Sequence, residues 1–287
     1  MSNLPDINSY WQDNIPQIWY SNKEPLSLAW FNELSAKRYQ VYYPYLKDYA
    51  EFYDHSGEEV LEIGVGPGTD LVEFHSGGAM VSGIDLGQNQ IDLTKLNFKS
   101  RSLPIPNLNV GNAEDLDFEA EKFDYVYSFG VLHHTPNTQN AIDEIFRVLK
   151  SDGHATIMLY SRGWKHYLKR CFVQGIIRGK WFKYKSWQGV YNYASEVNGD
   201  SPLTQVFTKK QVRKLFANFN QVEIYKLRMG EFFEYAPYGT YKFWKFLSHT
   251  AEFLNLQSVL GENYIIKAYK APAKDKNRLI DVLFKHY

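Results

Sequence analysis

One stretch decides the fold: Val60-Leu61-Glu62-Ile63-Gly64-Val65-Gly66-Pro67-Gly68-Thr69-Asp70. It joins an apolar run, typical of a buried strand, to a turn with glycine at every second position. Glycine is needed where the backbone comes close to a ligand, because any Cβ would fill that space. Many nucleotide-binding folds contain such a turn, and a purely structural glycine turn is the alternative. The spacing departs from Gly-x-Gly-x-x-Gly, which disfavours a pyrophosphate site.

Short apolar runs alternate with amphipathic segments on both sides of this turn, from Glu58 to Tyr160. Such alternation generates a parallel sheet covered by helices, so we expect an α/β core. The expected strands are 60–63, 80–84, 108–110, 123–127 and 155–159, with 222–227 and 264–269 further along the chain. The second strand ends in Ile84-Asp85, where an acidic side chain can accept hydrogen bonds from ribose hydroxyls.

Two helices are expected from the pattern outside the strands. An apolar stripe at three- and four-residue spacing predicts a helix from Thr138 to Lys150, which the segment Ser151-Asp152-Gly153 then turns into the next strand. Thr208 is expected to cap a second helix.

The chain divides into three parts by the same pattern. Residues 1–56 are predicted to form a helical N-terminal cap, 57–270 the main domain with insertions at 161–207 and 229–262, and 271–287 a C-terminal tail.

The charge balance, the cysteine count and the lack of long apolar runs limit the possible partners and cellular location. Lys plus Arg and Asp plus Glu are both 32, so the whole chain has no bias toward nucleic acid or anionic membrane. The one cysteine, Cys171, excludes an intrachain disulfide and a Cys-rich zinc site, and we expect no metal. Neither a signal peptide nor a membrane-spanning run of about 18 apolar residues is present, so a cytoplasmic location is expected.

Five motifs in order carry a family resemblance. They are the glycine turn, Val81 to Leu86, Gly111-Asn112-Ala113-Glu114-Asp115-Leu116, Phe123 to Pro136 with its Leu132-His133-His134-Thr135-Pro136 ending, and Ile142 to Gly153. Together they resemble class I S-adenosylmethionine (SAM) dependent methyltransferases of the UbiE-like, type 11 subfamily. The resemblance implies a Rossmann-like, seven-stranded, doubly wound sheet with a reversed final strand. It also implies SAM as cofactor and S-adenosylhomocysteine as product.

The resemblance also implies roles for individual residues. Those expected to bind the cofactor are Glu62, Gly64, Gly66, Gly68 and Thr69 at the methionine part, Asp85 at the ribose hydroxyls, Leu86, Asn112, Ala113 and Glu114 around the adenine, and Phe129 and Gly130 beside the methyl group. Asn112 stands where the family usually has Asp, and its amide oxygen can still accept from the adenine amino group. Asp85 has the alternative of capping the next helix. Arg38 is expected to pair bidentately with the cofactor carboxylate, an exposed surface arginine being the alternative.

Three residues are candidates for catalysis. His133 and His134 can remove a proton from an acceptor near neutral pH, and the alternative is that they hold their loop in place. His134 resembles the histidine of phosphoethanolamine methyltransferases that works with an N-terminal tyrosine, for which Tyr20 is the candidate here.

The acceptor is less defined. Eight Lys or Arg and no Asp or Glu fall between Ser161 and Val190, interleaved with aromatic residues. This pattern fits a lid over an anionic acceptor, a surface for anionic lipid, a nucleic-acid contact, or a solvated amphipathic lid. We expect a small, anionic or aromatic acceptor, methylated at N, O or C in specialised metabolism, and no nucleic acid.

Other functions remain open on the sequence alone. They are a lipid- or quinone-type acceptor at a membrane surface, other SAM-fold chemistry such as aminopropyl transfer, and a non-catalytic SAM-binding partner subunit. The oligomeric state is not predicted.

Overall fold

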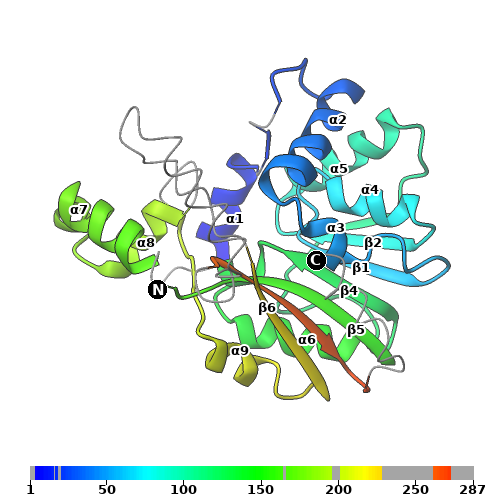
Figure 1. Ribbon diagram of the computed structural model, residues 1–287. Helices are drawn as coiled ribbons and strands as arrows, with labels where there is room; N and C mark the ends of the chain where they lie inside the picture. The colour runs from blue at the N-terminus through cyan, green and yellow to red at the C-terminus, as the bar shows by residue number, and fades with distance from the viewer. Residues whose placement is uncertain are drawn as a thin grey trace, which may run out of the picture.

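The computed structural model describes residues 4–15, 17–18, 21–163, 166–195, 201–227 and 261–272. Its centre is one seven-stranded sheet, shown in Figure 1. The strands are β1 Glu59–Ile63, β2 Met80–Asp85, β3 Asn107–Val110, β4 Phe123–Phe129, β5 Leu149–Tyr160, β6 Gln221–Leu227 and β7 Asn263–Tyr269. They lie in the order β3-β2-β1-β4-β5-β7-β6, with β7 antiparallel to both of its neighbours. The predicted α/β class and reversed last strand are confirmed.

Helices cover both faces of the sheet (Figure 1). They are α4 Thr69–Ser76, α5 Gln88–Ser100, α6 Thr138–Val148 and α9 Lys209–Leu215. Alternate residues of a strand point to opposite faces, and the two faces of β4 accordingly feed two separate apolar cores. Val126 joins the core under α6 and α9, whereas Tyr125 and Tyr127 join the core under α4 and α5.

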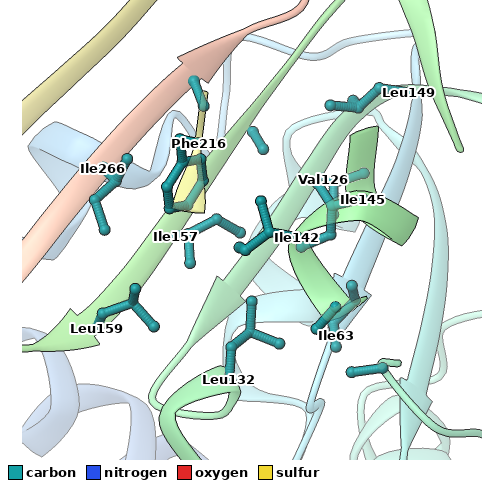
Figure 2. Packing of buried hydrophobic residues seen from close by; sticks show 14 of the residues in the cluster. Ile63, Val126, Leu132, Ile142, Ile145, Leu149, Ile157, Leu159, Phe216 and Ile266 are labelled. Atoms are coloured by element: carbon teal, nitrogen blue, oxygen red, sulfur yellow. The ribbon is translucent and has the colours of Figure 1, made fainter. Parts of the chain in front are cut away.

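The core beneath α6 is shown in Figure 2, where Ile142 and Ile145 of α6 face Val126 and Ile157 of the sheet. All four side chains are buried. Burying each such side chain stabilises the fold by about 1.5–3 kcal/mol, so this stripe fixes α6 against the sheet. Asn137 caps the helix by accepting a hydrogen bond from the backbone N–H of Asn140.

The end of α6 differs from the prediction. The helix stops at Val148, and β5 begins at once with Leu149, whose backbone is extended at φ −69° and ψ 138°. Leu149 pairs with Phe123, but the next pair is His154 with Tyr125, so the residues between bulge out of the ladder. The predicted turn at 151–153 is therefore wrong: it is a bulge within the strand. At the second predicted helix, Thr208 does cap α9, in a capping box with Gln211.

The N-terminal segment contributes helices, as Figure 1 shows beside the sheet. They are α1 Leu4–Asp13, α2 Leu28–Lys37, the π-helix η2 Arg38–Tyr42 and α3 Leu46–Ala50. After β4 comes the short 3-10 helix η3 Leu132–His134. The first predicted insertion contains the π-helix η4 His166–Ile177, α7 Lys180–Tyr184 and α8 Trp187–Ser195.

The predicted division of the chain into three parts includes segments outside the described residues. Most of the insertion at 229–262 and most of the tail at 271–287 lie outside the described residues. The boundaries of the three parts stay predictions. Among the described helices, none has the length and apolar character needed to cross a bilayer.

Candidate active site

The glycine turn after β1 has the geometry that needs glycine. Gly64, Gly66 and Gly68 have φ angles of 84°, 50° and 73°, a region that other residues rarely adopt. A Cβ on Gly64 would lie 2.1 Å from a methyl carbon of Val131, so that glycine allows close packing. A Cβ on Gly66 would meet nothing within 4 Å, so this backbone faces open space. The turn is thus packed against Val131 at Gly64, and its backbone is uncovered by side chains at Gly66.

Asp85 closes the turn from the end of β2. Its Oδ2 accepts a hydrogen bond from Gly66 N at 3.0 Å and its Oδ1 one from Gly87 N at 3.3 Å, just before α5 begins. The carboxylate therefore joins the glycine turn to the start of α5, and it stays half-buried rather than enclosed. Burial raises the pKa of Asp85 to about 6, although the backbone N–H groups oppose this shift.

Glu62 lies within the strand that leads into the turn. Its side chain is 3% exposed, and its Oε2 has no hydrogen-bond partner among the described residues. Burial raises the pKa of Glu62 well above its usual value, and the negative charge of Asp70 adds to the effect. A buried carboxylate oxygen without a donor is costly unless a cation or donor from a ligand reaches it.

Arg38 differs from both expectations: its side chain is buried, and the Nε and Nη2 edge of its guanidinium binds another residue. It is buried, and its Nε and Nη2 both donate to the carboxylate of Asp70, which also accepts from the hydroxyls of Tyr39 and Tyr127. The bidentate partner predicted for Arg38 was the cofactor carboxylate, whereas the partner in the structure is Asp70. The guanidinium carbon lies 4.9 Å from the centre of the Phe129 ring. A cofactor role for Arg38 stays a prediction, and it would have to use Nη1 and the second N–H of Nη2.

The predicted adenine turn follows β3. Asn112 Oδ1 accepts from Glu114 N at 3.0 Å, so the amide oxygen expected to meet adenine also holds its own turn. Glu114 Oε1 accepts from Asn137 N at 2.5 Å and so joins this turn to the start of α6. Ala113 is buried, whereas Leu86 keeps part of its surface exposed. The adenine roles stay predictions.

The two histidines of η3 are both buried, but they differ in their contacts. His133 is fully buried, with its ring centre 3.8 Å from that of Tyr160. His134 Nδ1 lies 2.7 Å from the backbone oxygen of Leu203. Because a carbonyl only accepts, Nδ1 carries the hydrogen, and in the neutral imidazole the lone pair is then on Nε2. This geometry suits His134 better than His133 for proton transfer. Tyr20 lies outside the described residues.

Helix α1 brings a residue to this region that the sequence did not single out. The ring of Trp11 lies 4.8 Å from that of His134, and Asn89 at the start of α5 donates to the backbone oxygen of Gln12 at 3.0 Å. Helix α1 therefore links the Asp85 end of β2 to the histidine loop. The only sequence signal was the tryptophan itself, one of many aromatic residues in the first 55 positions.

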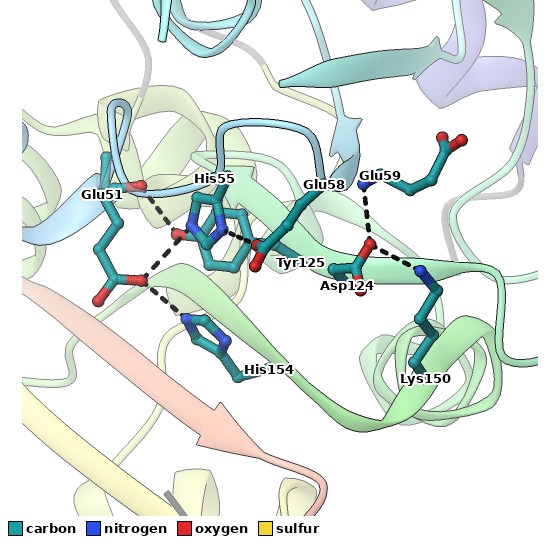
Figure 3. Close-up of polar contacts among 9 residues, drawn as sticks. Glu51, His55, Glu58, Glu59, Asp124, Tyr125, Lys150 and His154 are labelled. Atoms are coloured by element: carbon teal, nitrogen blue, oxygen red, sulfur yellow. Dashed lines mark hydrogen bonds and ion pairs between the residues drawn. The ribbon is translucent and has the colours of Figure 1, made fainter. Parts of the chain in front are cut away.

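A second polar cluster lies beside β5 and contains Glu51, His55 and His154 (Figure 3). Their ligating atoms are within 4.8 Å of one another, as in a possible metal site. However, Glu51 Oε2 and His154 Nε2 are 2.7 Å apart, closer than the roughly 3.3 Å between two ligands of a tetrahedral zinc ion. The Lys267 ammonium also binds Glu51 Oε1 at 2.5 Å. We interpret the cluster as an ion-pair network.

Comparison with known proteins agrees with this geometry. The sheet order with one antiparallel strand is that of class I, Rossmann-like methyltransferases. Residues 61–157 match the family model of a methyltransferase domain. Residues 61–157 therefore form a methyltransferase domain of the class I, SAM-dependent type 11 kind.

Two curated relatives and one solved structure illustrate the likeness. The chain is 26% identical over 163 residues to phosphoethanolamine N-methyltransferase 2 of Caenorhabditis elegans, covering 55% of this chain and 37% of the relative. It is 30% identical over 112 residues to the ubiquinone biosynthesis O-methyltransferase of Coxiella burnetii, covering 39% and 47%. The matches thus span less than half of either relative.

The solved structure extends the likeness to nearly the whole fold. Geranyl diphosphate C-methyltransferase from Streptomyces coelicolor A3(2), in complex with Mg²⁺, geranyl diphosphate and S-adenosyl-L-homocysteine, is similar with a TM-score of 0.58 at 13% identity. This alignment covers 93% of the present chain and 98% of that structure. At such low identity it shows the fold alone.

Proposed function

We propose that the protein binds SAM at the glycine turn and transfers its methyl group to a small acceptor at N, O or C. The observation that carries the proposal is the bare backbone at Gly66 with the Asp85 carboxylate bonded to it. The carboxyl ends of parallel strands are where open α/β sheets bind their ligands, and both residues lie there.

The charge of the site supports a cationic ligand. Glu62, Asp70 and Asp85 bring three carboxyl groups to the turn, and Arg38 neutralises one of them through its bond to Asp70. SAM carries a positive sulfonium and a positive ammonium group beside one carboxylate. The orphaned Oε2 of Glu62 fits one of these cationic groups, and Asp85 fits the ribose hydroxyls.

The protein's part in the reaction is mainly positioning. SAM supplies its own leaving group, so a nucleophile needs alignment with the methyl carbon and exclusion of water. Phe129 and Gly130 at the end of β4 are the residues we assign to that place. His134 Nε2 takes a proton only when the acceptor arrives protonated, and the Leu203 carbonyl fixes the ring for it.

Two measurements test the proposal. Isothermal titration with SAM and S-adenosylhomocysteine is expected to give micromolar binding, which Asp85→Ala abolishes. A methyl-transfer assay over amine, phenol, carboxylate and phosphate-ester acceptors is expected to give turnover with one class. Retained micromolar SAM affinity in Asp85→Ala refutes the cofactor site. SAM binding without turnover on any class favours the non-catalytic partner instead.

A further inference from the structure

The outer part of the first insertion carries apolar side chains directed at solvent. They lie at the end of η4, on α7 and at the start of α8, and we call them the outer apolar surface: Phe172, Ile176, Ile177, Trp181, Phe182 and Trp187. Phe182 is 75% exposed and Ile177 is 66% exposed. Single exposed apolar residues are ordinary, but a group of this size on successive elements marks an interaction site.

Most of this surface takes no part in the packing of its own segment; Trp187 is the exception, because its ring lies against Gly175 of η4. Helix α7 has five residues and none of them is buried. The segment is held instead by α8, whose Val190 and Tyr191 are buried. In Figure 1, α7 lies at the outer end of the molecule, beside η4 and α8. Burial within the fold therefore does not account for the apolar residues of α7.

The charge around the surface has one sign. Arg178, Lys180, Lys183 and Lys185 lie among the apolar residues, and the sequence has no Asp or Glu from residue 161 to residue 195. The whole chain is balanced, so this excess is local. Aromatic and aliphatic tips flanked by lysines are the composition of segments that lie in the interface of an anionic bilayer.

We propose that the outer apolar surface docks on the face of an anionic lipid bilayer. Ile177 and Phe182 enter the boundary between headgroups and acyl chains, and the neighbouring lysines meet the headgroup phosphates. Two other occupants fit less well. Single-stranded RNA binds by stacking on aromatic rings, to which Ile176 and Ile177 add nothing. A second protein would bury a patch core depleted of lysine, whereas lysines alternate with the apolar residues here.

The test is flotation of the full chain with phosphatidylcholine vesicles, with and without phosphatidylglycerol. We expect binding to the anionic vesicles and weaker binding as salt is raised. Phe182→Ala is expected to lower the partition coefficient about tenfold, because the lost ring no longer leaves water. Lys183→Gln with Lys185→Gln is expected to lower it by a similar factor on anionic vesicles. Circular dichroism verifies that each variant is folded.

Matched controls lie on other elements. Ile105 is 53% exposed in the loop before β3, and Lys95 is exposed on α5, so Ile105→Ala and Lys95→Gln are expected to bind vesicles as the parent does. Absence of vesicle binding overturns the proposal, as does equal loss in the controls. RNA binding in place of vesicle binding, or a dimer that Phe182→Ala dissociates, also overturns it. The assay needs no SAM, so its failure is separate from failure of the cofactor site.

Discussion

Asp85→Asn is expected to weaken SAM binding and to change the stability of the free protein by two opposing effects. The carboxylate has a pKa of about 6 instead of 3.8, since burial disfavours its charge. Asparagine keeps the size and one acceptor oxygen but loses the charge behind the two hydrogen bonds that we propose Asp85 accepts from the ribose, and such charge-assisted bonds are each worth about 1.5–3 kcal/mol. The Kd should therefore rise by at least about a hundredfold, since 1.4 kcal/mol is a factor of ten.

The sign of the stability change follows from the direction of the pKa shift. A carboxyl group with a folded-state pKa above its unfolded value binds its proton more tightly in the folded state. It therefore costs stability as pH rises from 3.8 to about 6, and the full cost is present above pH 6. Removing the charge is expected to recover at most about 3 kcal/mol at pH 7, and less because the carboxylate is still partly exposed. Against this, the amide nitrogen of asparagine cannot accept from Gly66 N or Gly87 N, which costs about 1–3 kcal/mol.

The same pKa makes SAM binding depend on pH. In the proposed site SAM binds the charged form of Asp85, so binding should displace a proton, and the affinity is expected to fall up to tenfold for each pH unit below about 6. Titration calorimetry between pH 5 and pH 8, in buffers of different ionisation enthalpy, measures both affinity and proton release. Asp92→Asn, an exposed carboxylate on α5, is the control. A Kd independent of pH, or an Asp85→Asn variant with parental affinity, refutes the reasoning.

Three further changes give distinct outcomes. Gly66→Ala is expected to fold, to lose about 1 kcal/mol of unfolding free energy because of its positive φ, and to lose SAM binding. Gly64→Ala should lose clearly more unfolding free energy, because its Cβ clashes with Val131; urea denaturation measures both values. His134→Ala is expected to lower turnover more than SAM affinity, and equal losses would favour a structural role. Glu51→Gln leaves a buried lysine ammonium without its carboxylate and should cost about 3–5 kcal/mol at pH 7. Burial alone would raise the pKa of Glu51, but the hydrogen bond to His154, the nearby ring of His55 and the Lys267 ammonium hold this pKa well below its usual value. The cost of the substitution should therefore shrink as pH falls below about 4.5.

The sequence predicted the features that depend on neighbouring residues. Each strand was an apolar run bounded by Gly, Asp or Asn, and Thr208 capped its helix through a residue three positions away. The bulge before His154 could not be predicted, because it arises from pairing with β4, more than twenty residues earlier. Such register shifts belong to the assembled sheet.

The sequence predicted which residues belong to the site, but not which hydrogen-bond partners they have. The glycine turn and Asp85 were evident from spacing, yet the partner of Arg38 is 32 residues away in the chain and that of His134 is 69 away. The aromatic residues of the first insertion show the same limit. Trp181 and Tyr191 look alike in the sequence, but the first is exposed and the second is buried.

The direction of β6 bears on how the protein could be changed to take a different methyl acceptor. Since β7 runs antiparallel to both β5 and β6, those two strands run the same way, and Tyr160 and Leu227 both lie opposite Asn263. The chain therefore leaves the sheet after Tyr160 and after Leu227 at one rim, the rim that also carries Asp85. Exchanging the two segments that follow these exits between homologous enzymes should alter which acceptor is accepted while leaving the nucleoside half of the molecule untouched. The nucleoside-binding half of the sheet would then stay constant while the segments after Tyr160 and Leu227 vary.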